Sequence, residues 1–569
     1  MDINENIKAW LTNDEVPQEL KNEIKKMDET ALKNAFFQEM QFGTAGLRGI
    51  IAPGPNSMNV LTVKRATIGY GLFIKKHYSY MYMEKPIVVI AHDNRHMHDE
   101  FTNIVAQTLN NMGINTIVFD SLRPTPLLSY AIKFFKAQGG VMITASHNPK
   151  EYNGYKVYDN NGCQLSTDNS MEVTKLIDDN NILPPYNEHI VENKGTNNIA
   201  NHDVDDCFIN DCKKVCLNPQ EEKKIKVVFT PQHGCSAVLG VRILKELGYD
   251  VYPVEEQMVP DPDFGATQSP NPEKPEAYIK AIELAKKVGA DLIVSTDPDA
   301  DRCGIGYLSS NGEYVLQTGN QTGAALIQYI LNERKKRNLI PSDNPVIIQS
   351  IVTASLGSRI AKSFGVNTIK VLTGFKYLAG KMEEISTDDP KRFQFAYEES
   401  YGYIVRDICR DKNSIESLAI ISEMINHYYL KGLRLDQVMD KIYDEFGYTF
   451  NKNIELYFNS SEASAAGSKL DVLRKHMPTS LLGRKIIKVE DFKNQYSYDP
   501  SNPTEKEIMN TLPVENVLIL HMEDGCFFAV RPSGTEPKIK FYYECRGTNR
   551  EEVHSLPEKF HAEIAKIIG

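Results

Sequence analysis

The chain has 569 residues, of which 41% are hydrophobic and 24% are charged, and these proportions are ordinary for a globular protein. A chain of this length exceeds what one hydrophobic core supports, so several domains are expected. Lys and Arg number 64 against 75 Asp and Glu, a net charge of −11. This balance excludes an overall basic surface, and no nucleic-acid partner is expected.

The first residues, MDINENIKAWLTNDEVPQEL, lack the basic start and the apolar stretch of a signal peptide. No apolar stretch approaches the length that spans a membrane. The nine cysteines are scattered and odd in number, which favours a reducing compartment over a disulfide framework. We therefore expect a cytoplasmic protein without a membrane partner or an obligate protein partner.

A glycine-rich stretch, QFGTAGLRGI, places Thr44 and Arg48 among three glycines. Glycine lets the backbone approach a ligand closely, but it also serves ordinary turns. Taken alone, the stretch is better interpreted as a structural turn.

Three segments share one pattern of apolar strand, polar turn, helix and second strand: residues 86–120, 224–254 and 345–372. In each, a glycine (Gly113, Gly248 and Gly365) falls where a helix ends. Repeated strand–helix–strand units predict α/β layers with largely parallel strands, with ligands at the carboxyl ends of the strands. Their wide separation indicates three similar domains rather than a solenoid.

TASHNP, from Thr144 to Pro149, directly follows the apolar run GGVMI, and GYKVYDNNG comes soon after. Asn-Pro is a common turn dipeptide, so a plain loop is one interpretation. The other is a nucleophilic serine, Ser146, with polar neighbours that handle its proton. The motif alone does not decide between the two.

Cys207, Cys212 and Cys216 lie close to His202 and raise the question of a zinc site. The spacing lacks a C-x-x-C pair, and Cys212 with Cys216 is expected to form an i, i+4 pair on a helix. Core thiols are the favoured interpretation.

In ADLIVSTDPDADRCGIG a strand is predicted to end near Thr296, and Asp297, Asp299 and Asp301 follow. Three carboxylates on one loop suit Mg²⁺, which prefers oxygen ligands. An EF-hand is excluded, since the sixth residue counted from Asp297 is arginine. A solvated acidic turn is the alternative, but mutual repulsion of the carboxylates argues against it.

Two further stretches, TGFKYLAG and AYEESYGY, place polar groups near strand ends and are weak signals alone. In AVRPSGTEPKIKFYYE, the planar fork of Arg531 suits a phosphate. Hydroxyls and glycine in the same stretch suit an anion-binding turn, although a plain hairpin is equally compatible. The spacing is not that of a Walker A loop.

The end of the chain alternates strands with turns such as Glu523-Asp524-Gly525 and finishes with a helix from about Glu551. This pattern predicts a smaller α+β domain. The expected division is 1–205, 206–317, 318–449 and 450–569, with three similar mixed α/β domains and the C-terminal domain arranged around a central cleft.

Taken together, TASHNP, DPDADR, EESYG and RPSGTEP occur in the order found in the α-D-phosphohexomutases. The chain resembles that family over nearly its whole length. FGTAGLRG, TGFKYL and EESYGY are most similar to the phosphoglucomutase/phosphopentomutase branch.

The resemblance implies that Ser146 becomes phosphorylated and that its oxygen holds Mg²⁺ together with Asp297, Asp299 and Asp301. It places Arg48, His147, Lys156 and Arg302 around the same centre. Sugar and phosphate contacts are implied for Thr44, Gly374, Lys376, Glu398, Ser400, Arg531, Ser533, Gly534 and Thr535.

Phosphoryl transfer depends mainly on positioning and charge neutralisation, so a metal and cations around one hydroxyl are chemically sensible. A proton must also leave the attacking sugar hydroxyl. Lys156 and His147 are the candidates for receiving it, provided that burial near Arg48 and Mg²⁺ depresses the pKa of the lysine.

The family implies a mutase of small-molecule sugar phosphates that uses glucose 1,6-bisphosphate as intermediate and activator. Glucose 1-phosphate and glucose 6-phosphate are the expected pair. Ribose or deoxyribose phosphates are the first alternative, because hexose and pentose differ by one hydroxymethyl group, which changes binding by only about 1–3 kcal/mol. Mannose phosphates are a further alternative. A metal-dependent phosphatase and an inactive sugar-phosphate sensor are alternatives of other classes.

Overall fold

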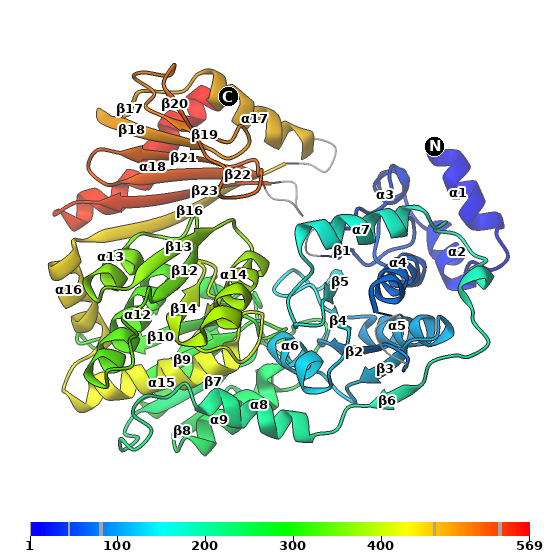
Figure 1. Ribbon diagram of the computed structural model, residues 1–569, viewed down its shortest axis with the longest axis horizontal. Helices are drawn as coiled ribbons and strands as arrows, with labels where there is room; N and C mark the ends of the chain where they lie inside the picture. The colour runs from blue at the N-terminus through cyan, green and yellow to red at the C-terminus, as the bar shows by residue number, and fades with distance from the viewer. Residues whose placement is uncertain (1, 44–45, 79–83, 459–462, 533–537) are drawn as a thin grey trace. The chain divides into compact units, whose positions relative to one another are not determined.

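The computed structural model describes residues 2–43, 46–78, 84–458, 463–532 and 538–569. It separates into two compact units, Met1–Gly319 with Phe375–Leu435, and Asn320–Gly374 with Asp436–Gly569. Figure 1 shows the elements of both units along the chain. Among the described helices, none combines the length and apolar character needed to cross a membrane.

The first unit begins with a small helical cluster and a six-stranded sheet in the order β1-β5-β4-β2-β3-β6. The elements are α1 Ile3–Thr12, α2 Gln18–Ile24, α3 Glu29–Phe36, β1 Leu47–Ile50, α4 Val60–Tyr78, β2 Ile87–His92, α5 His98–Asn111, β3 Asn115–Val118, α6 Thr125–Phe134, β4 Gly139–Ile143, β5 Tyr152–Tyr158, α7 Thr167–Asp178, a 3₁₀ turn Asn187–His189, and β6 Asn197–Ile199.

Alternation along the strands explains why helices cover both faces of this sheet. Val88 and Ile90 of β2 share an apolar core with α4, α5 and α7, in which α4 packs against both of the other helices (Figure 1). On the other face a Cβ added at Gly140 would lie 2.6 Å from Ile132 of α6. Because successive strand residues point to opposite faces, an almost continuous apolar strand is buried on both sides.

The helices before the sheet have a core of their own. Trp10 is completely buried there, and its ring meets Phe36 edge to face at 5.7 Å. Val16, Ile24 and Ala35 join these rings in the buried cluster, and Leu61 of α4 completes it.

The second sheet of this unit has the order β11-β10-β9-β7-β8. β7, β8 and β9 run parallel, whereas β10 and β11 are antiparallel to their neighbours. The elements are α8 Asp203–Lys213, β7 Lys226–Thr230, α9 Ser236–Glu246, β8 Asp250–Pro253, α10 Glu255–Met258, a 3₁₀ turn Pro275–Tyr278, α11 Ile279–Val288, β9 Leu292–Thr296, β10 Cys303–Leu308 and β11 Tyr314–Gln317.

The third region repeats the parallel pairing in β12 and β13, while β14 and β15 pair antiparallel. Its elements are α12 Gly319–Lys336, β12 Val346–Ser350, α13 Leu356–Ser363, β13 Asn367–Val371, α14 Phe375–Asp388, a 3₁₀ turn Pro390–Arg392, β14 Phe393–Tyr397, β15 Tyr403–Ile404, α15 Ser414–Leu430 and α16 Leu435–Phe446. The prediction of three mixed α/β regions is confirmed.

The predicted helix ends are also correct. Gly113, Gly248 and Gly365 have φ of +83°, +91° and +75°, the left-handed conformation that glycine adopts without a Cβ clash.

The C-terminal region is an antiparallel sheet with two helices, as predicted. The strands are β16 Thr449–Tyr457, β17 Ser480–Leu481, β18 Arg484–Asp491, β19 Tyr496–Tyr498, β20 Lys506–Ile508, β21 Leu518–Met522, β22 Phe527–Pro532 and β23 Lys538–Arg546, and the helices are α17 Ala463–Lys475 and α18 Arg550–Ile568. Gly525 turns the chain between β21 and β22 with φ +82°, and α18 begins one residue before the expected start.

The interpretation of the cysteine group needs correction. α8 ends at Lys213, so Cys212 and Cys216 do not form an i, i+4 pair on one helix. After Lys213 the backbone hydrogen bonds join residues three apart instead of four, and Cys216 N donates to the Lys213 carbonyl. Cys212 is buried but Cys207 is exposed, so the three thiols are not all core residues.

Gly139 of β4 packs closely against Tyr70 of α4, and a substitution there tests the packing of the first sheet. A Cβ on Gly139 would lie 2.0 Å from the Tyr70 hydroxyl, which itself donates to the Tyr158 carbonyl at 2.7 Å. Gly139→Ala should therefore destabilise the protein by about 1–3 kcal/mol, a typical cost of overpacking.

The measurement is the midpoint of thermal unfolding followed by circular dichroism. Gly380→Ala in α14 is the control, because a Cβ there meets nothing within 4 Å and alanine favours a helix. An unchanged midpoint for Gly139→Ala would contradict the described packing.

Candidate active site

Ser146 lies in the turn that follows β4. Its φ is +53°, a left-handed conformation that costs a non-glycine residue about 1–2 kcal/mol. Its backbone N–H donates to Thr144 Oγ1 at 2.8 Å, and the residue is almost completely buried. The turn therefore holds one hydroxyl in a defined position at the end of a central strand.

The Ser146 hydroxyl meets a carboxylate from the second sheet. Oγ donates to Asp297 Oδ2 at 2.6 Å and lies 3.2 Å from Nδ1 of His147. Ser146 and Asp297 are 151 residues apart, so the fold brings the two predicted motifs together.

The loop after β9 gathers the three predicted carboxylates. Asp297, Asp299 and Asp301 are buried and offer oxygens that lie within 4.8 Å of one another. Ala300 adopts φ +55° inside this loop. The Asp297 Oδ1 accepts hydrogen bonds from the backbone N–H groups of Asp301 and Arg302, at 3.1 and 2.9 Å, which fixes the turn.

Neighbouring segments support the loop from outside. Thr125, at the start of α6, donates its backbone N–H to the Asp299 carbonyl at 2.9 Å and its hydroxyl to Asp299 Oδ2 at 3.0 Å. Cys235 N donates to the Pro298 carbonyl at 2.7 Å. A Cβ on Gly234 would lie 2.3 Å from that same oxygen, so only glycine fits without a shift.

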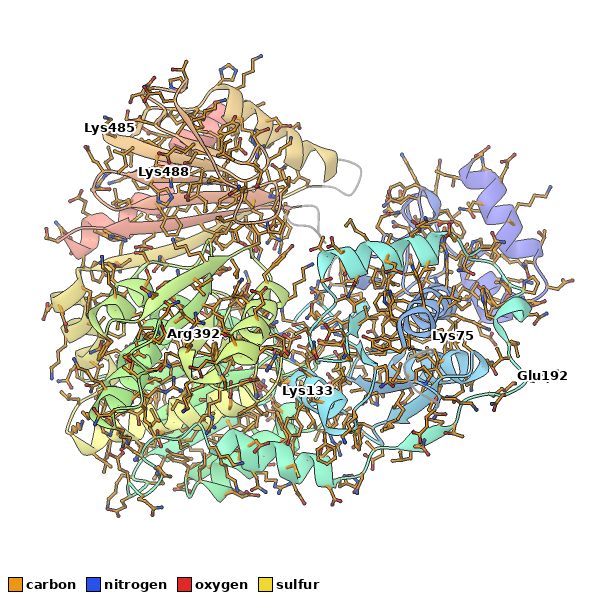
Figure 2. All side chains as sticks on the ribbon, viewed as in Figure 1. Lys75, Lys133, Glu192, Arg392, Lys485 and Lys488 are labelled. Carbon is orange, nitrogen blue, oxygen red and sulfur yellow. The ribbon has the colours of Figure 1, made fainter. Side chains whose placement is uncertain are left out.

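Cations neutralise the buried carboxylates. Lys156 Nζ lies 2.7 Å from Asp299 Oδ2 and 3.5 Å from Asp301 Oδ2, and Lys412 Nζ lies 3.0 Å from Asp301 Oδ2. Arg302 Nε is 3.9 Å from Asp301 Oδ1. By contrast, Lys133, Glu192 and Lys485 are charged side chains on the exposed surface (Figure 2).

Opposing influences act on the pKa of Lys156 among the groups described. Burial does lower the pKa of Lys156, but the negative charges of Asp299 and Asp301 outweigh it, and the net direction is upward. Opposite charges at this distance favour the charged form of a lysine.

The carboxylates fit a divalent cation. Asp299 Oδ1 and Asp301 Oδ1 are buried and accept no hydrogen bond within the described part of the chain, although a buried carboxylate oxygen normally has a partner. Burial raises the pKa of Asp297, and Asp299 and Asp301 raise it further by repulsion. Hard oxygen donors of this kind are the ligands that Mg²⁺ prefers.

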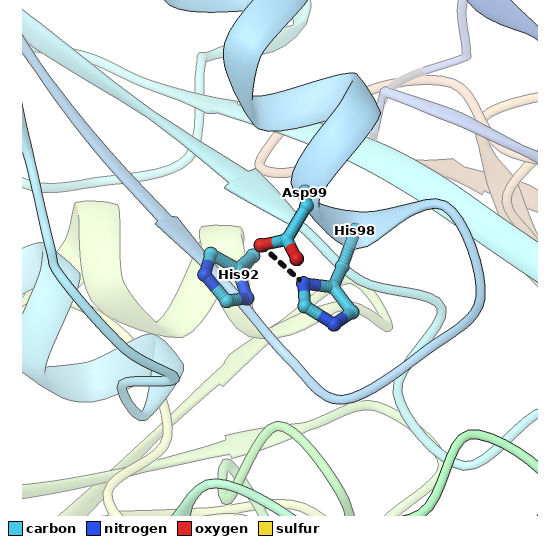
Figure 3. Close-up of side chains that lie close together, drawn as sticks. All are labelled: His92, His98 and Asp99. Carbon is cyan, nitrogen blue, oxygen red and sulfur yellow. Dashed lines mark ion pairs between the residues drawn. The ribbon is translucent and has the colours of Figure 1, made fainter.

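A second group with metal-ligand side chains, His92, His98 and Asp99, does not have a suitable geometry (Figure 3). The two imidazoles stack with centroids 4.5 Å apart and an interplanar angle of 15°. Ring nitrogens bind metals in the ring plane, so parallel planes do not converge on one ion. Nδ1 of His92 also lies 2.8 Å from the Asp93 carbonyl.

Of the other predicted residues in the first unit, Arg48 contacts the serine turn, whereas Lys376 contacts Thr167. Arg48 of β1 donates to Asn148 Oδ1 in the serine turn at 3.2 Å, and the strand register places it opposite Gly154 of β5. Lys376 donates to Thr167 Oγ1 at 3.3 Å. Glu398 is buried, and Ser400 is partly exposed in the turn after β14.

The remaining predicted residues belong to the second unit or lie outside the description. Gly374 has φ +119°, and Arg531 of β22 donates its Nε to Glu515 Oε1 at 2.8 Å. Thr44, Ser533, Gly534 and Thr535 lie outside the described residues.

Sequence reasoning missed Lys412 and its neighbour Asp411. Lys412 lies between Asp301 and Asp411, at 3.0 and 3.3 Å. Asp411 accepts hydrogen bonds from Tyr158 and Gln164. The only signal was the charged run RDKN ahead of an apolar helix, which is typical of many solvated loops.

Four profiles of one family match successive parts of the chain. They are the phosphoglucomutase/phosphomannomutase alpha/beta/alpha domains I, II and III, at residues 39–182, 206–308 and 318–446, and the C-terminal domain, at residues 499–563. The chain belongs to the phosphoglucomutase/phosphomannomutase family. It is therefore an isomerase of the intramolecular phosphotransferase type.

Relatives within the family match over nearly their whole length. A phosphoglucomutase of Staphylococcus haemolyticus is 36% identical over 532 residues, which cover 92% of this chain and 93% of the relative. One of Staphylococcus epidermidis is 37% identical, covering 88% and 90%.

Solved structures of the phosphoglucomutase/phosphomannomutase family share the fold. A putative phosphomannomutase of Thermus thermophilus matches with a TM-score of 0.68 and 20% identity, covering 93% of this chain and 99% of the other. A phosphoglucomutase of Paramecium, pp63/parafusin, matches with a TM-score of 0.64 and 18% identity, covering 93% and 96%.

The cluster of Asp297, Asp299 and Asp301 predicts that Mg²⁺ binds to and stabilises the folded protein. Adding Mg²⁺ should raise the thermal unfolding midpoint, because a ligand that binds only the folded state stabilises it. In Asp301→Asn this rise should be lost or shift to at least tenfold higher Mg²⁺, since one charged ligand oxygen is replaced. Asp263→Asn, at an exposed carboxylate, is the control and should respond as the wild type does. Equal responses of Asp301→Asn and wild type would exclude this site.

Proposed function

We propose that the protein interconverts α-D-glucose 1-phosphate and glucose 6-phosphate through a phosphorylated Ser146 and glucose 1,6-bisphosphate. The observation that carries the proposal is the hydrogen bond of 2.6 Å from Ser146 Oγ to Asp297, inside a buried group of three carboxylates and two lysines. Identity of 33–37% to phosphoglucomutases over most of the chain supports the choice of glucose.

In the proposed reaction, phosphoserine 146 transfers its phosphoryl group to the free hydroxyl of the sugar monophosphate. The bond between phosphorus and Ser146 Oγ breaks, and a bond between phosphorus and the sugar oxygen forms. The proton of the sugar hydroxyl goes to a base, and Ser146 Oγ is left with the electron pair. The bisphosphate then returns its other phosphoryl group to Ser146 by the reverse of these steps.

The described residues suit this transfer because it needs concentrated positive charge around one oxygen. Lys156 and Lys412 bring ammonium groups to the carboxylates, and Arg302 brings a guanidinium, which is held in place by an ion pair with Glu273. Asp297, Asp299 and Asp301, with the Ser146 oxygen, would hold Mg²⁺. When bound, the ion would neutralise charge on the transferring phosphoryl group.

His147 and Lys156 stay the two candidates for the base. His147 Nδ1 lies 3.2 Å from Ser146 Oγ, within reach of a proton near that oxygen. Lys156 is held by two carboxylates, and a lysine must first lose its proton to act as a base.

The sugar and its second phosphate are proposed to contact the other predicted residues. Lys376, Glu398 and Ser400 in the first unit offer a cation, a carboxylate and a hydroxyl, which suit sugar hydroxyls and phosphate. Arg48, beside the serine turn, suits the reacting phosphate. The phosphate that does not react is assigned to Arg531, whose planar guanidinium can bind it through two nitrogens, together with its sequence neighbours Ser533, Gly534 and Thr535. Thr44 and Gly374 are proposed as further substrate contacts.

The choice of sugar is tested by comparing rates on glucose, mannose and ribose 1-phosphates under one set of conditions, with ³¹P NMR to follow both esters and inorganic phosphate. The expected result is the highest kcat/KM for glucose 1-phosphate and measurable activity on ribose 1-phosphate, since the sugars differ by one hydroxymethyl group. A higher kcat/KM for ribose or mannose would change the sugar assignment. Inorganic phosphate released as fast as the isomer forms would instead favour a phosphatase.

Ser146→Ala should lose at least roughly 10³-fold in kcat, because no covalent acceptor remains for the phosphoryl group. Wild-type protein should carry phosphate on the peptide that contains Ser146, as read by mass spectrometry. Adding glucose 1,6-bisphosphate should increase its occupancy. Ser129→Ala, at a buried serine of α6, is the control and should keep its phosphate on Ser146. Phosphate found on another peptide would contradict the assignment.

A further inference from the structure

The turn between β2 and α5, residues 93–97, carries an arginine that no motif assigned to the site. Arg95 is completely buried. Its Nη1 donates to the carbonyls of Pro149 and Tyr152, at 2.8 and 2.9 Å. Its Nη2 donates to the carbonyls of Ser146 and Asn148, at 2.6 and 2.5 Å. One guanidinium therefore binds four backbone oxygens of the serine turn, including that of Ser146 itself.

A second connection runs from the same turn to the Ser146 amide. Asp93 Oδ2 lies 3.3 Å from Arg95 Nε and accepts a hydrogen bond from Thr144 Oγ1 at 2.6 Å. Thr144 Oγ1 in turn accepts from Ser146 N at 2.8 Å. The backbone on both sides of the Ser146 Cα is thus bound, directly or through Thr144, to the Asp93–Arg95 ion pair.

The turn itself is fixed at both ends. His92 at the end of β2 stacks on His98 at the start of α5 (Figure 3), with ring centroids 4.5 Å apart. The ring of Phe264, from the second sheet region, lies 5.2 Å from Arg95 Cζ. These contacts hold the Arg95 side chain in one position.

Arginine suits this position for a geometric reason. Its guanidinium presents five N–H donors in one rigid plane, whereas a lysine ammonium is a compact charge with three donors. Four carbonyls at 2.5–2.9 Å satisfy the two terminal nitrogens completely. A lysine at this position could reach only some of them.

We propose that Arg95 is a positioning residue that holds Ser146 in its left-handed conformation and keeps Oγ aimed at the acidic loop. The inference rests on the proposed function, in which Ser146 Oγ leaves and receives a phosphoryl group in each turnover. The oxygen must return to the same place after each transfer, and a displacement of about 1 Å costs roughly 100-fold in rate. Arg95 does not touch the reacting atoms and acts through the backbone of the turn.

The test compares Arg95→Lys with Arg65→Lys. Arg65 is a matched control because it is also buried and its Nε donates to the carbonyls of Ile177 and Asn180, at 3.1 and 2.7 Å. Both variants should lose thermal stability. Only Arg95→Lys should lower kcat, by roughly 30-fold or more, with KM for glucose 1-phosphate changed less than about threefold.

A second readout isolates the serine turn. The rate at which glucose 1,6-bisphosphate phosphorylates Ser146, measured by rapid quench and mass spectrometry, should fall at least roughly 30-fold in Arg95→Lys and stay near wild type in Arg65→Lys. Should Arg95→Lys not fold, the charge-balanced pair Asp93→Asn with Arg95→Gln replaces it and should show the same losses.

The results distinguish a failure of the Arg95 role from a failure of the proposed function. If wild-type protein isomerises glucose 1-phosphate and a folded Arg95 variant keeps kcat and the phosphorylation rate within about threefold, the role of Arg95 is overturned. Equal losses of kcat in the Arg95 and Arg65 variants would overturn it too, since they would reflect stability alone. If wild-type protein isomerises no sugar phosphate, the proposed function itself fails.

Discussion

Three buried carboxylates, whose oxygens lie within 4.8 Å of one another, determine how the candidate active site is built. Isolated charges of this kind are strongly disfavoured in a protein interior unless cations and hydrogen bonds compensate them. The compensation comes from separate segments: Lys156 on β5, Lys412 before α15 and Thr125 at the start of α6. The loop after β9 is thus stabilised only where the first sheet, the second sheet and residues 411–412 come together. Ser146 Oγ lies at the same place, 2.6 Å from Asp297.

The turn that carries Ser146 also depends on its surroundings. Ser146 has a φ of +53°, which is unfavourable for a non-glycine residue, so contacts with neighbouring residues must stabilise this conformation. Six backbone or side-chain contacts from Arg95, Asp93 and Thr144 do this. The network satisfies backbone oxygens that a tight turn would otherwise leave buried and unpaired.

Parts of this site could be predicted from the sequence because its motifs are local. Asp297, Asp299 and Asp301 follow β9 at alternate positions, and Ser146 is the third residue after β4. Their placement at the carboxyl ends of strands therefore needed only the strand assignments. The three mixed α/β regions could also be predicted, because apolar strands and amphipathic helices alternate along each of the three segments. The domain boundaries themselves stay predictions.

What the sequence did not reveal depends on long-range packing. Lys412 and Arg95 stand in charged runs that resemble solvated turns, and only the fold shows that they are buried. For Lys156 to act as a base, burial near Arg48 and Mg²⁺ had to lower its pKa. The two carboxylates that face its ammonium are 143 and 145 residues away, and among the protein groups they outweigh the effect of burial on this pKa. Cys216 was placed on a helix that ends three residues earlier, because a helix end without glycine gives a weak signal.

The burial of Trp10 has a spectroscopic consequence. It is the only tryptophan in the chain. Its side chain is completely buried in an apolar cluster formed by the N-terminal helices and Leu61 of α4, and its indole N–H has no hydrogen-bond partner among the described residues. Its fluorescence should therefore be emitted from an apolar environment at short wavelength, and it reports on that helical cluster alone. Titrations of sugar phosphate or Mg²⁺ followed by intrinsic tryptophan emission would be nearly silent even when binding is tight, whereas opening of the amino-terminal cluster would give a large red shift.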